Sequence, residues 1–257
     1  MEEKGQLKIQ VFSSLPLISV FQDGKEIQKL KPKDGLVWLD LPAGNTSFFL
    51  ALKGENGTLL DQYTIEPIPI PNLKSLDFKE IAVNVGSNCA YLQPKGKTVW
   101  LASQASQPGS FGTVGGLLFS SGNKRIGTTA YVQGTEDKPL FQTQQTGIQQ
   151  FKADVPDGQY QVEIYLAELE PKKREANVLY DLGGAGKSAS TTGNRKFHIQ
   201  VNGQMWLENV EPETGSGGLS AISYKSTFDA KDETGLTLNF IPVVGEPVLN
   251  GIRIVRK

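Results

Sequence analysis

The sequence predicts an all-β protein made of two β-sandwiches in tandem. Three observations lead to this fold class: short segments alternate apolar and polar residues, turn signals separate them, and no long window has a helical period. Alternation with a period of two is typical of half-buried strands, and turns recurring about every ten residues are typical of antiparallel sandwiches. With 257 residues, of which 38% are apolar, the chain is long enough to bury a core in each sandwich.

The first sandwich is predicted over residues 1–66. Apolar residues alternate with polar ones at 7–11 and again at 37–41. Residues 22–25, Gln-Asp-Gly-Lys, have the composition of a tight hairpin turn. These signals predict a small set of short antiparallel strands rather than helices.

A linker is predicted at residues 67–78. Pro67, Pro69 and Pro71 occupy every second position there. Proline donates no ladder hydrogen bond, so this stretch does not fit a central strand and reads as a stiff extended connection. The second sandwich is then expected over residues 79–257.

The clearest strand of the second unit is predicted at residues 160–166. It follows a turn at 155–158, Val-Pro-Asp-Gly, and alternates apolar with polar residues throughout. Similar strands are predicted at 197–201, before an Asn-Gly turn, and at 252–255. The second unit therefore also reads as a stack of short strands joined by polar loops.

Composition and charge exclude several classes of function. The chain has 26 basic and 27 acidic residues, whereas a nucleic-acid-binding domain has a basic excess or stripe, so no nucleic-acid partner is expected. No apolar run approaches about 20 residues, so no membrane span is expected, and the polar N-terminus does not read as a signal peptide. Cys89 is the single cysteine and is predicted to be a small buried hydrophobe. No cofactor or metal is predicted, and a structural Ca²⁺ is left open.

Short motifs recur along the second unit in a fixed order. They lie at residues 83–88, 99–100, 109–112, 134–135, 140–143, 155–160, 167–168, 197, 201–203 and 249–252. In that order and spacing they resemble a malectin-like carbohydrate-binding module. The first unit is similar to the Ig-like sandwich found towards the C-terminus of β-galactosidase-type glycoside hydrolases of family two.

The resemblance implies both a fold and a function. The second unit is expected to be a malectin-like jelly roll that recognises an oligosaccharide or polysaccharide through loops at one end, and the first an Ig-like spacer. The tandem order implies a C-terminal fragment of a β-galactosidase-type enzyme. On this reading the chain itself is not an enzyme, its partner is the catalytic domain of the parent, and its location is periplasmic or secreted.

The candidate sugar-binding residues also come from the resemblance. A pyranose ring has an apolar face, which aromatic side chains cover, and a rim of hydroxyls, which carboxylates and amides bind. At the positions that face the ligand in malectin, this sequence keeps an aromatic ring at Phe111 but has Thr146 and Glu170 at others. Glu246 is the nearest match to an acidic residue before the last strand. The full candidate set is Phe111, Gln145, Thr146, Glu170, Tyr180, Glu246 and Asn250, with Tyr180 replacing a missing aromatic and Gln145 and Asn250 as hydroxyl partners.

Other conspicuous residues have plainer interpretations. Trp100 follows alternating residues and is predicted to lie in the core, as most large aromatics do. Trp38 is predicted to point away from its apolar neighbours. Glu136-Asp137 reads as a solvated turn, and Glu168 as a structural carboxylate that holds a neighbouring loop.

Two other functions stay open at this stage. Because stacking aromatics are missing, a second interpretation is a decayed sugar site in a structural or interaction module that packs on the parent enzyme or dimerises it. An independent hydrolase would need paired carboxylates, for which Glu136-Asp137 and Glu168-Glu170 are the candidates. The sequence does not name the sugar.

Overall fold

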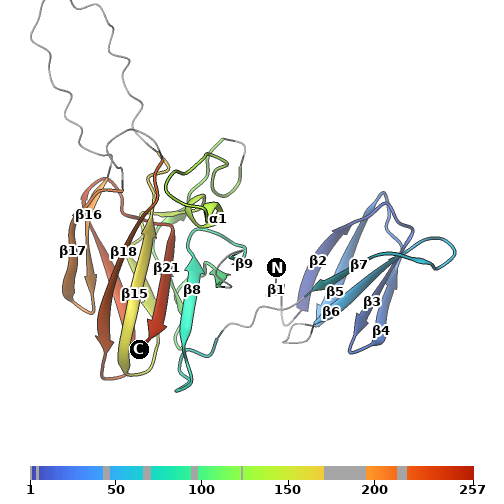
Figure 1. The fold of residues 1–257 in the computed structure, drawn as a ribbon, viewed down its shortest axis with the longest axis horizontal. Coiled ribbons are helices and arrows are strands. Elements are labelled where there is room, and N and C mark those ends of the chain that lie inside the picture. The colour runs from blue at the N-terminus through green and yellow to red at the C-terminus, as the bar shows by residue number, and fades with distance from the viewer. Residues whose placement is uncertain are drawn as a thin grey trace, which may run out of the picture. The chain divides into compact units, whose positions relative to one another are not determined.

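The computed structural model describes residues 2–3, 6–42, 47–65, 71–93, 98–122, 124–170, 195–212 and 219–257. The chain divides into two units, residues 1–69 and 70–257 (Figure 1). Within the described ranges the regular structure is almost entirely β, with a single four-residue helix, α1 (Lys138–Phe141). The predicted all-β class is confirmed.

The first unit consists of two sheets. One has the order β1-β2-β5 and the other β4-β3-β6-β7. Their strands are β1 (Glu2–Glu3), β2 (Gln6–Phe12), β3 (Leu17–Gln22), β4 (Lys25–Leu30), β5 (Leu36–Pro42), β6 (Phe48–Lys53) and β7 (Leu59–Ile65). Ile18 and Val20 of β3 pack in one buried cluster with Leu39 and Leu41 of β5, so the two sheets share a core.

Local sequence signals explain two features of the first unit. Asp23 and Gly24 both have positive φ, 51° and 77°, and connect β3 to β4 in the tight hairpin that the sequence predicts. In β5 the buried Leu39 and Leu41 alternate with exposed residues, and Trp38 is 54% exposed. Trp38 therefore points away from the core, as predicted.

The second unit contains two large sheets and a small one. The six-stranded sheet has the order β18-β15-β21-β8-β10-β9, the five-stranded sheet β11-β14-β19-β16-β17, and the small sheet β12-β13-β20. Every pairing is antiparallel except that of β8 with β10. The strands are β8 (Glu80–Asn84), β9 (Tyr91–Leu92), β10 (Val99–Ala102), β11 (Phe111–Val114), β12 (Leu117–Leu118), β13 (Gln145–Thr146), β14 (Gln150–Ala153), β15 (Gly158–Leu166), β16 (Lys196–Val201), β17 (Gln204–Val210), β18 (Ile222–Ala230), β19 (Leu236–Val244), β20 (Val248–Leu249) and β21 (Gly251–Arg256).

The main core of the second unit lies between its two large sheets. Strand β15 buries Val162 and Ile164 there, and β16 of the other sheet buries Phe197 and Ile199 in the same cluster. The alternation in the sequence sets this arrangement, because successive side chains of a strand point to opposite faces. The predicted strand at 160–166 is confirmed, and Figure 1 shows it between β18 and β21.

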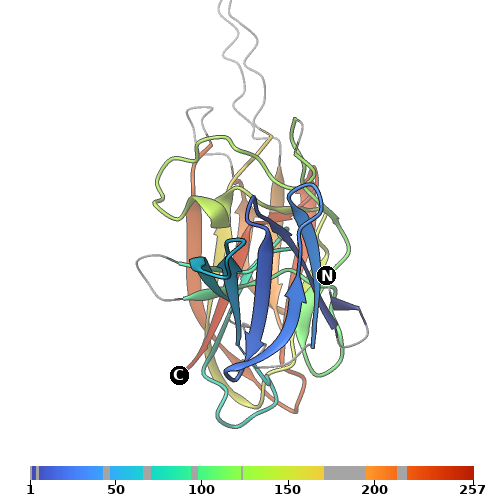
Figure 2. The same cartoon turned by 90° about the vertical axis from the view of Figure 1, so that its right-hand side faces the viewer.

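A second apolar cluster covers the outer face of the six-stranded sheet. Trp100 of β10 packs there with Leu140 and Phe141 of α1 and with Phe119, and it is 2% exposed. The prediction that Trp100 belongs to the core is therefore confirmed, although it belongs to this outer cluster. Figures 1 and 2 show α1 beside one end of the sheet in two perpendicular views.

The prediction for Cys89 is wrong. Its side chain is exposed, because it lies in the turn that follows β8 rather than in a strand. Its Sγ contacts the side-chain oxygen of the neighbouring Asn88, 3.3 Å away. As to membranes, α1 is the longest helix in the described ranges, and no helix there has the length and apolarity needed to cross a bilayer.

Candidate functional site

Three of the predicted sugar-binding residues come together at one end of the second unit. Thr146 ends β13 and pairs with Val248 of β20. The next residue, Gly147, donates its backbone N–H to the carbonyl of Pro247 at 2.8 Å, which places the β13 end against Glu246. Glu170 follows β15 in the sequence. It lies at the same end of the unit, where its carboxylate contacts Arg195. We call Thr146, Glu170, Arg195 and Glu246 the rim cluster.

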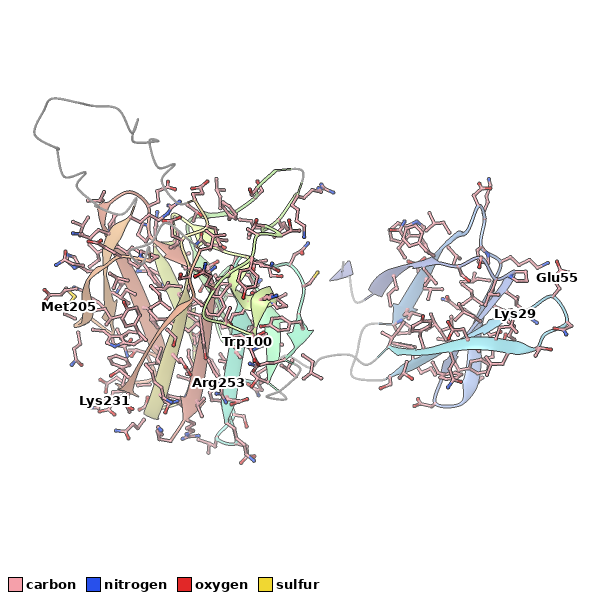
Figure 3. All side chains as sticks on the ribbon, turned by 45° about the horizontal axis from the view of Figure 1, so that its top comes forward. Lys29, Glu55, Trp100, Met205, Lys231 and Arg253 are labelled. Carbon is pink, nitrogen blue, oxygen red and sulfur yellow. The ribbon has the colours of Figure 1, made fainter. Side chains whose placement is uncertain are left out.

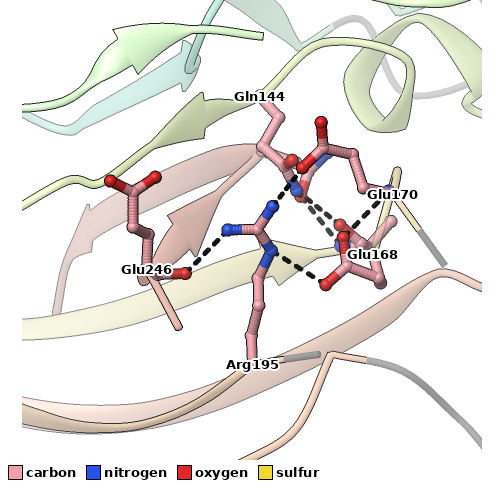
Figure 4. A network of polar contacts seen from close by, with 7 residues as sticks. Gln144, Glu168, Glu170, Arg195 and Glu246 are labelled. Atoms are coloured by element: carbon pink, nitrogen blue, oxygen red, sulfur yellow. Dashed lines mark hydrogen bonds and ion pairs between the residues drawn. The ribbon is translucent and has the colours of Figure 1, made fainter. Parts of the chain in front are cut away.

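Arg195 holds the rim cluster together (Figure 4). Its Nε donates to Oε2 of Glu168 at 2.9 Å, and one terminal nitrogen donates to Oε2 of Glu170 at 2.6 Å. The other terminal nitrogen donates to the backbone carbonyl of Glu246 at 3.0 Å. A guanidinium is a planar fork of donors, so one side chain can join three chain segments in this way. Glu170 and Arg195 are 25 positions apart in the sequence, and their ion pair brings these two positions together.

Glu168 is the buried member of this network. Its side chain is 2% exposed, and besides the ion pair with Arg195 its Oε1 accepts the backbone N–H of Glu170 at 2.9 Å. Burial raises the pKa of Glu168, while the Glu170 N–H and the Arg195 guanidinium oppose that rise. The prediction of a structural carboxylate that holds a loop is confirmed.

Two carboxylates of the rim cluster face solvent. The Glu170 side chain is 57% exposed, and Glu246 is exposed as well. The Glu246 carboxylate lies over Gly147, 3.5 Å from where a β-carbon would stand, and makes no hydrogen bond or ion pair with any described residue. Carboxylate oxygens accept hydrogen bonds in pairs. The cluster can therefore bind a ligand that carries adjacent hydroxyls.

The rim cluster is acidic. Together with Glu168 it has three carboxylates and one guanidinium, which gives a formal charge of −2 for these residues. The guanidinium nitrogens already donate to protein oxygens. An anionic ligand would therefore meet net repulsion from the described part of this site.

Phe111 is not the aromatic platform that the sequence predicts. It is 1% exposed, begins β11 and packs on Phe151 with ring centroids 6.5 Å apart. The backbone beside it is closely covered, since a β-carbon on Gly112 would lie 2.5 Å from the Ala105 carbonyl carbon. The alternation of β11 directs this ring into the core, so it has no face free for a sugar.

The two predicted amide partners are also structural. Asn250 is fully buried: its Oδ1 accepts the N–H of Ala167 at 2.8 Å, and its Nδ2 donates to the carbonyl of Thr143 at 2.7 Å. Gln145 is 7% exposed, and its Nε2 donates to the carbonyl of Gly115 at 2.9 Å. Both amides satisfy backbone groups that strands leave unpaired, so the prediction that they bind hydroxyls is wrong.

The remaining predicted residues have different outcomes. Thr146 is half-buried, and its hydroxyl oxygen is buried without a hydrogen-bond partner in the described part of the chain. Tyr180 lies outside the described residues. Arg195 was missed by the sequence prediction; its only signal was its place at the far end of the polar excursion that begins near Glu170. Among the described residues no group of three or more His, Cys, Asp or Glu side chains is arranged to hold a metal.

Two solved structures of Bacteroides uniformis β-glucuronidases share this architecture. The chain resembles the solved structure of a Bacteroides uniformis β-glucuronidase, with a TM-score of 0.73 and 25% identity over 98% of this chain and 27% of that one. A calcium-binding mutant of Bacteroides uniformis β-glucuronidase 2 gives a TM-score of 0.74 with the same identity and coverage. The ANXUR1 extracellular domain from Arabidopsis thaliana gives a TM-score of 0.47 at 10% identity, over 98% of this chain and 81% of that one.

The chain thus spans about a quarter of the length of the β-glucuronidases that it resembles. No curated protein matches it. The family model described as "Malectin domain" matches residues 80–241, which is more than half of the chain and most of the second unit. The chain belongs to the malectin-domain family.

Proposed function

We propose that the chain is a non-catalytic carbohydrate-binding region of a family-two glycoside hydrolase, acting outside the cytoplasm in the periplasm or after secretion. The second unit binds a glycan at the rim cluster, and the first unit is an Ig-like spacer. Family membership supports the binding role, and the coverage of 98% of this chain but 27% of a β-glucuronidase supports attachment to a larger enzyme. The enzyme supported in this way is a β-glucuronidase rather than the β-galactosidase suggested by the sequence.

The observation that carries this proposal is the pair of exposed glutamates that Arg195 contacts, Glu170 through its carboxylate and Glu246 through its backbone carbonyl. Glu170 and Glu246 come from distant parts of the sequence, and Arg195 contacts both residues. The guanidinium fixes the Glu170 carboxylate directly and holds the Glu246 backbone in place, so both residues are positioned before a ligand arrives. They are suited to accept hydrogen bonds from adjacent hydroxyls of a sugar ring.

The charge of the rim cluster selects the kind of glycan. Its formal charge of −2, counted with Glu168, disfavours a uronic acid, and the guanidinium nitrogens of Arg195 are already engaged. We therefore propose a neutral sugar as the ligand, distinct from the glucuronide on which the parent enzyme would act. Binding is expected to be modest, because each hydrogen bond contributes only about 1 kcal/mol.

The rim cluster is a binding site rather than a catalytic one. Glycoside hydrolysis needs two carboxyl groups that both reach the scissile bond, one of them as a proton donor. Glu168 has the raised pKa of a candidate acid, but it is buried and ion-paired with Arg195. Catalysis is therefore assigned to another domain of the parent protein.

Affinity gel electrophoresis, in which a bound polysaccharide slows the protein, tests the proposed glycan binding. We expect one or more neutral polysaccharides, such as a β-glucan or β-galactan, to retard the protein in native electrophoresis. Glu246→Gln should weaken that binding about tenfold, because an amide replaces one oxygen acceptor with a donor. Glu208→Gln, on exposed β17, is the matched control and should bind as the unmodified protein does.

Two results would contradict the proposal. One is equal retardation of the protein and its Glu246→Gln variant; the other is no retardation by any neutral polysaccharide on a broad panel. The second result would favour the structural role, for which exposed Ile241, Val243 and Val244 on β19 offer an apolar contact surface. That role predicts self-association or binding to the catalytic domain, which sedimentation measures.

A further inference from the structure

A cavity of about 680 Å³ lies on the outer face of the six-stranded sheet. None of the rim-cluster residues lines it. Its volume falls within the range of about 300–1,000 Å³ that is typical of small-molecule sites. This cavity was not predicted from the sequence, because its residues come from β10, β15, β18, β21 and the segment that contains α1.

The floor of the cavity is a row of charged side chains. In the strand register, Glu163 of β15 lies opposite Lys225 of β18 on one side and opposite Arg253 of β21 on the other. All three point away from the main core, because Val162 and Ile164, the neighbours of Glu163, point into it. Figure 3 labels Arg253 and Trp100 on this part of the second unit.

One wall of the cavity is aromatic. Tyr165 lies edge-on to Trp100, with ring centroids 5.3 Å apart, and edge-on to Phe141 at 6.0 Å. Trp100 also stacks on Tyr91 at 6.3 Å, so the rings support one another. Such a wall offers an apolar surface of fixed shape beside the charged floor.

The lining of the cavity also includes a carboxylate just before α1. Oδ1 of Asp137 accepts a hydrogen bond from the Tyr91 hydroxyl at 3.0 Å, which fixes its orientation. The interpretation of Glu136-Asp137 as a solvated turn is therefore wrong for Asp137, which is half-buried, and burial raises the pKa of its carboxyl group. Two buried donors of the lining, Nε1 of Trp100 and Nε of Arg253, have no acceptor among the described residues.

We infer that this cavity is a second saccharide-binding site, which takes a neutral pyranose unit independently of the rim cluster. Acceptors on Asp137 and Glu163 and donors on Lys225 and Arg253 face a common space beside aromatic rings, which suits alternating hydroxyls on a ring with an apolar face. Three carboxylates, including that of Glu136, and two cations line the cavity, and one of the cations, Arg253, is also ion-paired with Glu80 at 2.6 Å, so negative charge predominates there. That balance disfavours phosphorylated or carboxylated ligands.

The Trp100 indole N–H is a direct reporter for this site. The chain has three tryptophans, so its indole signals in a ¹H–¹⁵N correlation spectrum are few, and Trp100 is the one that lines the cavity. The probes are methyl β-D-glucopyranoside, methyl β-D-galactopyranoside and, as the anionic comparison, methyl β-D-glucuronide. We expect at least one neutral glycoside to shift the assigned Trp100 signal saturably, and the glucuronide to bind more weakly.

Two variants test whether the shift of the Trp100 signal results from binding in the cavity. Asp137→Asn and Lys225→Met should each weaken the binding seen at Trp100 about tenfold, as expected for loss of one charge-assisted hydrogen bond. Lys231→Met changes an exposed lysine outside the cavity, labelled in Figure 3, and should leave binding unchanged. Lys225 is itself exposed, so its replacement leaves the fold intact.

The rim variant separates this inference from the proposed function. Glu246→Gln should weaken polysaccharide retardation while leaving the titration of the Trp100 signal unchanged. The inference is overturned if no neutral glycoside, added at concentrations up to the solubility limit of the glycoside, shifts the Trp100 signal. It is equally overturned if Asp137→Asn and Lys225→Met leave the titration unaltered, or if Glu246→Gln abolishes it.

Discussion

Replacing Asn250 by alanine should lower the free energy of unfolding of the second unit by about 3 kcal/mol. The side chain is fully buried and joins Ala167, Thr143 and Phe141 through hydrogen bonds of 2.8, 2.7 and 3.3 Å. Alanine would leave these backbone groups buried without partners. Each such group costs about 1–3 kcal/mol, and partial relaxation keeps the total below their sum.

Urea unfolding followed by tryptophan fluorescence measures this loss, because Trp100 and Trp206 both lie in the second unit. Asn88→Ala is the matched control: Asn88 is exposed, and the change should stay within about 0.5 kcal/mol. A loss below about 1 kcal/mol for Asn250→Ala would mean that the amide is not structural, and would restore it as a candidate ligand.

Arg195→Met should destabilise the second unit by about 3 kcal/mol near pH 7.5 and by clearly less near pH 4.5. The variant leaves Glu168 buried without its counter-ion. Burial already raises the pKa of Glu168 in the folded protein, and loss of the cation raises it further. A carboxyl group with a raised folded-state pKa favours folding most below its unfolded pKa, and that contribution is lost as the pH rises through the folded pKa.

Denaturation at the two pH values checks this prediction. The double variant Glu168→Gln/Arg195→Met is the control, because it removes the stranded charge and should regain much of the stability at the higher pH. A loss for Arg195→Met that is the same at both pH values would show that Arg195 acts through packing alone. That outcome would remove the electrostatic basis of the rim cluster.

The elements that the sequence predicted well are those fixed by local patterns. The strand at 160–166 alternates over its whole length, and the hairpin at 22–25 needs residues that accept positive φ. Trp100 could be placed in a core because it follows alternating residues and large aromatic side chains are mostly buried. Each of these predictions uses only residues that are neighbours in the chain.

The site was predicted less well because it depends on contacts between distant segments. Phe111 stands between Ser110 and Gly112 and resembles a loop aromatic, yet the pairing of β11 with β14 turns it into the core. Asn250 and Gln145 are polar, but the backbone groups that they satisfy belong to other loops. Arg195 and Glu246 are 51 positions apart in the sequence, so no short motif predicts their contact.

The most direct test of the central claim is a structure of the chain bound to a neutral oligosaccharide taken from a polysaccharide that retards it. The account predicts sugar hydroxyls within hydrogen-bond distance of the Glu246 and Glu170 carboxylates, with the Arg195 contacts intact. A glycan bound elsewhere on the second unit, with the rim cluster empty, would contradict it.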